Sequence, residues 1–572
     1  KREAPRVAAP CAASPLGHPL AAGMGGRAAE PDPLLGGAGG AAEPKEAKPA
    51  ERRPARDSAE CGPPLAKRPR AEVGLLRDGA QLLCDYAEGL WGGKDTPTVE
   101  LATPSEIEAA FSSHGCALPL DDGAGASEAT IMEACRLALR YSVKSNHPLF
   151  FNQLYGRVEP TGLLAHWLTS AVNGNVHTYE VAPIFTLTEV HCLRKLAAVV
   201  GYPAEAEGLF VPGGSISNLY AIHLARFWKY PEAKTEGMWG CPRFVAFCST
   251  HAHYSTAKAA HVLGLGSNNL VQVATNRAGQ MRLDALEEAI SAAVAAGKTP
   301  LYVCATGGTT VTGAFDDLRG LRRICDRHKM WLHVDACWGG ASLLSSRPEV
   351  RALLDGIELT DSFAWNPHKF MGVPLQCSVF MTRHNGLLIE CNSAKAKYLF
   401  QPDKANGHLD IGDKTIQCGR LPDSFKLWLA WRHVGDGGWA QRMDRGIALV
   451  EHMAAQMRKG NWRGRFKVVL PQCFTNLCFW YFPPGLRDFD AFASKPDEDE
   501  WQQLHKVAPC IKARMQQDGK AMIGFQSIAL EGTATVPNFF RLVIAATWSL
   551  TSGDLEKTLA DIDSIGAELQ RY

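Results

Sequence analysis

Short apolar runs alternate with stretches of helical periodicity through the middle of the chain. Strands that alternate with helices usually pair in parallel and carry helices on both faces of the sheet. The pattern therefore predicts an α/β fold with a mostly parallel central sheet. The predicted strands are 244–248, 270–273, 301–305, 330–334 and 378–381.

The N-terminal part of the chain has a different pattern. Residues 1–72 are rich in Ala, Pro, Gly, Glu and Arg and have almost no aromatic residues. Such a segment buries too little apolar surface to offset the entropy cost of ordering, so we predict a disordered tail. Residues 73–146 carry apolar positions at helical spacing, as in 74–83 and 131–139, and predict an N-terminal helical segment.

The remainder divides into a large and a small domain. The strand-and-helix alternation extends from 147 to 420 and predicts the large domain. Residues 421–572 form a smaller mixed region, with predicted strands at 468–470 and 539–544, and predict a C-terminal α+β domain.

Composition narrows the class of protein. With 572 residues and a net charge of +1, nothing points to nucleic acid or to an anionic membrane surface. We find no apolar run of about 18 residues, so we expect no membrane span. The 17 cysteines are scattered singly without a CxxC pair, which favours reduced thiols in a cytoplasmic protein.

Two charged residues follow strand-like runs. Asp335 comes directly after the run 330–334, where a carboxylate can keep a pyridine nitrogen protonated or simply cap the next helix. Lys369 follows the run 363–365, and its amine can form a Schiff base with a carbonyl cofactor, although most lysines lie at the surface. The two residues in this order predict a cofactor site at the carboxyl ends of the strands.

A glycine-rich turn opens a predicted helix within 212–218. Its backbone N–H groups and helix dipole suit a phosphate, and Ser215 and Ser217 can add hydroxyl donors, although glycines also mark ordinary turns. His251 and His253 follow another strand, where an imidazole can stack on a planar ring or serve packing alone. No cysteine or carboxylate spacing accompanies them, so we expect no metal site.

Longer motifs surround these residues. Together they resemble the group II pyridoxal-phosphate decarboxylases, which have the fold-type I, aspartate aminotransferase-like architecture. The acidic amino-acid branch, with glutamate decarboxylase and cysteine sulfinic acid decarboxylase, is the most similar. The motifs are Phe151–Leu154, Thr178–Pro183, His333–Gly340, Asn366–Lys369, Leu375–Ser378, Tyr398–Gln401, Gly412–Lys414 and Gln417–Arg420.

The resemblance implies a role for each candidate residue. Lys369 would carry pyridoxal 5′-phosphate as a Schiff base, Asp335 would pair with the pyridine nitrogen, and His253 would stack on the ring. Gln153 and Arg541 would bind a substrate carboxylate, which the planar fork of an arginine suits. The resemblance also implies a homodimer. The remaining cofactor contacts would be Gly214, Ser215, Thr306, Ala336 and His368.

Two departures from glutamate decarboxylase concern the substrate and the proton donor. Tyr155 stands where those enzymes have a small residue, and a bulky ring would favour the shorter cysteine sulfinate or aspartate, giving hypotaurine or β-alanine. The segment 372–375 is more similar to glutamate decarboxylase, so glutamate, giving GABA, is the alternative. The loop 405–411 lacks the tyrosine expected to return a proton, which leaves His408 or His253 for that step.

A function of another class is also open. A paralogue that binds the cofactor without catalysis would tolerate the missing loop tyrosine. The presence of Asp335, Lys369 and Arg541 favours an enzyme.

Overall fold

The computed structural model describes nine segments of the chain. Residues 1–68 of the predicted disordered tail lie outside these segments. The described residues are 69–92, 96–120, 125–396, 398–401, 403–486, 488–489, 497–530, 535–545 and 548–569.

A seven-stranded sheet forms within the middle part of the chain, in the order β2-β8-β7-β6-β5-β3-β4. The strands from β4 to β7 are mutually parallel, whereas β8 runs antiparallel to both β2 and β7. The mostly parallel sheet is therefore confirmed, but β2 was not predicted and β8 reverses direction. The bounds are β2 Glu207–Val211, β3 Phe244–Ser249, β4 Leu270–Val273, β5 Thr299–Thr306, β6 Trp331–Asp335, β7 Ser362–Trp365 and β8 Ser378–Thr382.

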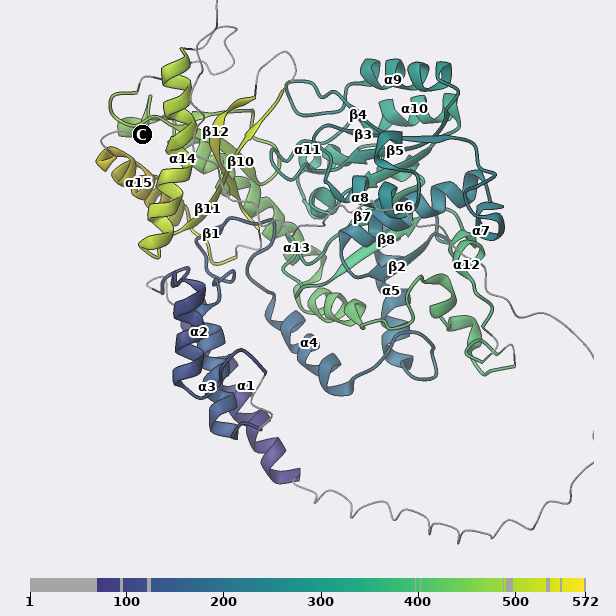
Figure 1. The fold of residues 1–572 in the computed structure, drawn as a ribbon, viewed down its shortest axis with the longest axis horizontal. Helices are drawn as coiled ribbons and strands as arrows, with labels where there is room; N and C mark the ends of the chain where they lie inside the picture. Colours follow the sequence, from purple (N-terminus) through teal and green to yellow (C-terminus); the bar gives the residue numbers. More distant parts are fainter. Residues whose placement is uncertain are drawn as a thin grey trace, which may run out of the picture. The chain divides into compact units, whose positions relative to one another are not determined.

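Helices cover both faces of this sheet, because its strands are apolar on both sides. Val245 and Phe247 of β3 pack in one core with α9 and α10, and the alternate residues Ala246 and Cys248 pack in another with α6 and α8. Figure 1 shows α9 and α10 side by side above β3 and β5. The helices are α5 Pro183–Val200, α6 Gly214–Lys229, α8 Ser255–Val262, α9 Leu283–Ala295 and α10 Leu318–His328.

A second sheet of five strands, in the order β1-β11-β12-β10-β9, carries its own apolar core against α14 and α15. The predicted strand 539–544 is found as most of β12, whereas the predicted strand 468–470 shares only Val468 with β9. Phe150–Phe151, in the range predicted for the large domain, pairs with this sheet as β1. The bounds are β9 Phe466–Val468, β10 Asn476–Tyr481, β11 Met522–Ile528, β12 Val536–Val543, α14 Glu498–Gln517 and α15 Ser552–Glu568.

In the sequence, the remaining helices come before, between and after the strands of the seven-stranded sheet. The predicted helical stretches 74–83 and 131–139 are found within α1 and α3, which pack on each other. Thr103 begins α2 with a reciprocal capping box to Glu106. No helix among the described residues is long and apolar enough to cross a membrane. The bounds are α1 Pro69–Gly92, α2 Pro104–Ser113, α3 Glu128–Tyr141, α4 Pro160–Val172, α7 Ala233–Glu236, α11 Pro348–Arg351, α12 Leu387–Asn392 and α13 Asp423–Gln456.

A buried ion pair fixes β2, the strand that leads into the glycine-rich turn. The Arg420 guanidinium binds the Glu189 carboxylate of α5, and both residues are almost fully buried. Arg420 also donates to the carbonyl oxygens of Val176 and Phe210, at 2.6 and 3.1 Å. The backbone N–H of Phe210 donates to Glu189 at 3.1 Å. The pair therefore ties β2 to α5 and to the segment that precedes α13.

Replacing Arg420 by methionine should lower the free energy of unfolding by about 3–5 kcal/mol, because it leaves the Glu189 carboxylate buried without its partner. Urea denaturation of the purified protein measures the change. The exposed pair of Arg140 and Glu100 is the matched control, and Arg140→Met should cost less than about 1 kcal/mol. Equal midpoints for the two variants would contradict the role assigned to Arg420.

Candidate functional site

A cavity of about 140 Å³ lies at the carboxyl ends of the central strands. The ends of β2, β3, β5, β6 and β7 meet there, as the rule for ligand sites in parallel sheets requires. Six of the residues predicted from the sequence line this cavity together. The lining residues are Gly214, Ser215, Asn218, His253, Ser255, Thr306, Gly308, Thr310, Asp335, Cys337, Trp338, Asn366 and Lys369.

The N-terminus of α6 forms one wall of the cavity. Gly213 precedes it with φ of 94°, a conformation that favours glycine. The first-turn N–H groups of a helix have no acceptor within the helix, and no side chain caps those of α6. Gly214 has no room for a side chain, since a Cβ there would lie 2.5 Å from Cys337 Sγ. The backbone can therefore approach an anion closely at this end.

The two serines of the turn differ. Ser215 lines the cavity as predicted. Ser217 is fully buried and its hydroxyl donates to the Val379 carbonyl of β8 at 3.4 Å, so the expected donor role of Ser217 is wrong for the described geometry.

Asp335 ends β6 and lies in the cavity wall, 7% exposed. Burial acts to raise the pKa of its carboxyl, but the charge of Lys369 and hydrogen bonds from Asn218 and Cys337 outweigh it and lower the pKa. Asn218 Nδ2 donates to one carboxylate oxygen at 2.8 Å and the Cys337 N–H to the other at 3.1 Å. The carboxylate is therefore charged at neutral pH.

Lys369 and His253 complete the chemistry of the cavity. Lys369 lies in the turn after β7, held by a backbone hydrogen bond to Asn366 at 2.9 Å. His253 follows β3, and Ser255 Oγ lies 2.8 Å from its Nδ1. Burial lowers the pKa of His253, as do the charges of Lys369 and Lys258, against the opposing effect of Asp335. The cavity thus combines a primary amine, a carboxylate and a neutral imidazole.

Three predicted cofactor contacts lie at or near the cavity. Thr306 lines it, and its buried Oγ1 has no hydrogen-bond partner among the described residues. Ala336 and His368 are buried behind the lining rather than in it. His368 Nδ1 lies 2.7 Å from the Cys377 carbonyl, and burial lowers the pKa of this histidine to about 4.

The three predicted substrate residues lie beyond the lining. Arg541 of β12 donates to the carbonyl oxygens of Asn152 and Thr310, at 2.5 and 3.4 Å. Because Thr310 lines the cavity, these bonds connect the small sheet to its rim. Gln153 is exposed beside Asn152, and the Tyr155 ring lies 6.2 Å from that of Phe150.

His408 lies away from this cavity. It is exposed on a short 3₁₀ turn, Gly407–Leu409, and it does not line the cavity of its own chain. Its loop is held by the segment that contains Tyr179 and Glu180. The Tyr179 N–H donates to Asp410 at 2.8 Å, and Lys404 pairs with Glu180 at 2.8 Å.

Several lining residues were missed. Asn218 and Asn366 lie within motifs that the sequence displayed, so their positions in those motifs could have identified them. Thr310 sits in the loop after β5 and carries no motif. Arg541 of β12 and Asn476 of β10 both donate to its carbonyl oxygen. Among the described residues no cluster of His, Cys, Asp and Glu has the arrangement of a metal site.

The chain is similar to proteins of known activity. The family model "Pyridoxal-dependent decarboxylase conserved domain" matches residues 120–482. Human cysteine sulfinic acid decarboxylase is 43% identical over 447 residues, 78% of this chain and 87% of that protein. Human acidic amino acid decarboxylase GADL1 is 42% identical over 441 residues, 77% of this chain and 81% of that protein. The crystal structure of mouse CSAD has a TM-score of 0.81 and 39% identity, covering 88% of this chain and 100% of that chain.

The tight approach at Gly214 leads to a prediction. Gly214→Ala should weaken the binding of pyridoxal 5′-phosphate by at least about tenfold, because the new methyl group collides with Cys337 and displaces the helix N-terminus. Fluorescence titration of the apo protein measures the affinity. Gly553→Ala is the matched control near the start of α15, where a Cβ meets only Thr551 at 3.8 Å. Unchanged affinity in Gly214→Ala would contradict an anion site there.

Proposed function

The chain belongs to the pyridoxal-dependent decarboxylase family, and from that premise we propose that it removes the α-carboxyl group of a small acidic amino acid as CO2. One observation carries the proposal: Lys369, Asp335 and the uncapped N-terminus of α6 share a single cavity. Cysteine sulfinate and aspartate are the favoured substrates. Two relatives above 40% identity, whose names specify cysteine sulfinic acid and acidic amino acids, support this choice.

The residues of the cavity fit pyridoxal 5′-phosphate. Its phosphate would lie on the Gly214 and Ser215 N–H groups, where the missing Cβ leaves backbone exposed. Thr306 Oγ1 and Asn366 Oδ1 are buried polar atoms without partners among the described residues, and a bound polar ring would satisfy them. When bound, the cofactor supplies an electron sink for the electrons of the bond to the departing carboxyl.

The proposal assigns a separate task to each polar residue of the cavity. Lys369 would provide the amine that holds the cofactor through its carbonyl group. Asp335 stays ionised because Lys369 and two hydrogen bonds stabilise its charge, so it can hold a proton on the pyridine nitrogen. His253, kept neutral mainly by burial, packs on the ring. Ala336 and His368 support this wall from behind.

Arg541 is proposed to bind a substrate carboxylate at the rim. Its hydrogen bonds to Asn152 and Thr310 fix the guanidinium and leave further N–H donors for an anion. Gln153 and Tyr155 follow Asn152 on the same segment. The ring of Tyr155 would shorten the side-chain pocket and favour aspartate or cysteine sulfinate, with glutamate as the alternative substrate.

The proton that returns to the substrate carbon comes from His253 or His408 in this proposal. His408 does not line its own cavity, so we place its action at the cavity of a second subunit. We therefore propose a homodimer in which the loop 403–411 of one subunit serves the other. The free thiols of the described cysteines, including exposed Cys84 and Cys418, suit a reducing compartment and support a cytoplasmic location.

Parallel CO2-release assays with cysteine sulfinate, aspartate and glutamate test the substrate. We expect both shorter acids to be turned over with higher kcat/KM than glutamate. Tyr155→Ser should raise the relative kcat/KM for glutamate, by roughly the 10–200-fold that one methylene is worth in a pocket. Lys369→Ala should release no CO2, whereas the exposed Lys557→Ala of α15 should behave as wild type.

Two results would contradict these assignments in different ways. A wild-type preference for glutamate would overturn the argument from Tyr155 and leave the decarboxylase intact. Turnover by Lys369→Ala equal to wild type would remove the lysine from the chemistry.

Mixed dimers test whether His408 acts across the interface. Homodimers of Lys369→Ala and of His408→Ala should each lose most activity. A heterodimer of the two regains one complete site if His408 serves the partner, so about half the activity of the wild-type dimer returns. No recovery in purified heterodimers would contradict action across the interface, and full activity in the His408→Ala homodimer would remove His408 from the reaction.

A further inference from the structure

A second histidine lies behind the cavity wall and is fully buried. His333 sits on β6 two residues before Asp335, with no exposed surface. Its ring stacks between Tyr302, at 6.1 Å, and Phe380, at 6.3 Å. It does not line the cavity, so it does not touch a bound ligand directly. Its two ring nitrogens nevertheless connect it to the residues that do.

Asn218 is the link between His333 and the cavity. Its Nδ2 donates to Asp335 Oδ2 at 2.8 Å and to Ser255 Oγ at 2.7 Å. An amide nitrogen has two hydrogens, so both are used. Its Oδ1 lies 3.0 Å from His333 Nε2. The amide cannot be turned over, because that would bring Oδ1 against the Asp335 carboxylate.

This orientation fixes the tautomer of His333. Since Asn218 Oδ1 can only accept, His333 Nε2 carries the proton and donates it. Nδ1 of the neutral ring then accepts from Ser362 Oγ, at 2.8 Å. Ser362 Oγ in turn accepts from Trp331 Nε1 at 2.8 Å. Burial lowers the pKa of His333 to about 4, so the ring stays neutral at physiological pH.

The hydrogen bonds of Asn218 and Ser255 also fix the tautomer of His253. Ser255 Oγ accepts from Asn218, so its own hydroxyl hydrogen points to His253 Nδ1, 2.8 Å away. The Ser255 N–H also donates to that nitrogen, at 3.3 Å. Nδ1 of His253 is therefore an acceptor, and the proton of the neutral ring is on Nε2. A histidine so arranged offers an N–H donor to the cavity that it lines.

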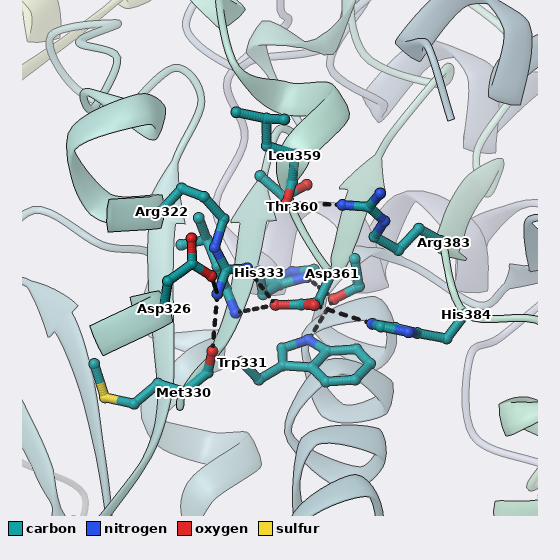
Figure 2. A network of polar contacts seen from close by, with 12 residues as sticks. Arg322, Asp326, Met330, Trp331, His333, Leu359, Thr360, Asp361, Arg383 and His384 are labelled. Carbon is teal, nitrogen blue, oxygen red and sulfur yellow. Dashed lines mark hydrogen bonds and ion pairs between the residues drawn. The ribbon is translucent and has the colours of Figure 1, made fainter. Parts of the chain in front are cut away.

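A second set of contacts, centred on Asp361, lies at the edge of the sheet opposite the cavity. Figure 2 shows Arg322 and His384 directed toward the Asp361 carboxylate. Asp361 accepts from Arg322 and from the Leu332 N–H, both at 2.8 Å, and from His384 at 3.0 Å. The His384 ring also lies 5.0 Å from that of Trp331. These contacts hold the starts of β6 and β7 in register.

We propose that His333 is a positioning residue of the decarboxylase site, which acts through Asn218 to orient Asp335 and to set the donor state of His253. The inference rests on the proposed function. Without the donor on His333, Asn218 Oδ1 loses its hydrogen bond, and the amide is held only by the two bonds that it gives to Asp335 and Ser255. One buried residue thus supports, through Asn218, the groups proposed to hold the ring nitrogen and to pack on the ring. The titratable and charged groups around this network are Asp335, Lys369, Lys258, His253, Tyr302, Cys304 and Cys337.

Four variants of the full-length holoenzyme test the proposal. His333→Leu removes the donor, and His333→Gln restores an N–H at a similar distance from Asn218. Phe380→Leu removes packing from the same ring and leaves every hydrogen bond in place. Ser255→Ala cuts only the branch to His253. For each variant we would measure the melting temperature, kcat, and the visible absorbance of the bound cofactor as a function of pH.

His333→Leu should lower kcat by about tenfold to a hundredfold, as losses of supporting hydrogen bonds at active sites do, and should shift the midpoint of the absorbance titration. His333→Gln should restore most of both. Phe380→Leu should lower the melting temperature without shifting the midpoint. Ser255→Ala should change the pH profile of kcat and leave the midpoint near the wild-type value.

Several results would overturn the proposal. An unshifted midpoint in His333→Leu, equal shifts in His333→Leu and Phe380→Leu, or no rescue by His333→Gln would reduce His333 to a packing residue. If His333→Leu does not fold, Asn218→Ala breaks the same link from the other side and must shift the midpoint. A wild-type protein without an absorbance band and without CO2 release would instead refute the proposed function, so the two failures are distinguishable.

Discussion

The charge of the buried Asp335 carboxylate is the constraint on which the rest of the site depends. A carboxylate in this position is costly, because burial disfavours its ionised form. Three partners offset that cost, namely the charge of Lys369 and the hydrogen bonds from Asn218 and Cys337. Each partner comes from a different segment of the chain. The charge persists only if the end of β6, the first turns of α6 and the turn after β7 keep their relative positions.

Ion pairs and hydrogen bonds outside the cavity hold these segments in place. The buried pair of Arg420 and Glu189 holds β2, and β2 delivers the glycine-rich turn to the cavity. Asp361 joins the opposite ends of β6 and β7 by accepting from the Leu332 N–H, and Arg322 and His384 pair with its carboxylate. Arg541 joins the small sheet to the loop that contains Thr310. The chemistry of the site therefore depends on contacts in both sheets.

The residues of the site that can be predicted from the sequence are those with local signals. Asp335, Lys369 and Gly214 each follow a strand or open a helix, so the rule for strand ends is enough to place them together. The reversal of β8 was not predictable from apolar runs, because a buried strand has the same pattern in either direction. Thr310 and the bonds of Arg541 depend on contacts more than 200 positions apart, which periodicity does not encode. Where His408 acts depends on a second subunit, and the sequence of one chain does not specify that interface.

The most direct test of the account is to identify the residue that carries the cofactor. Borohydride reduction of the holoenzyme fixes pyridoxal phosphate permanently to the amine that holds it, and mass spectrometry of the digested protein locates the label. The account predicts a single labelled lysine, Lys369, and no label when the cofactor is removed before reduction. A label on any other lysine, with Lys369 unmodified, would contradict it.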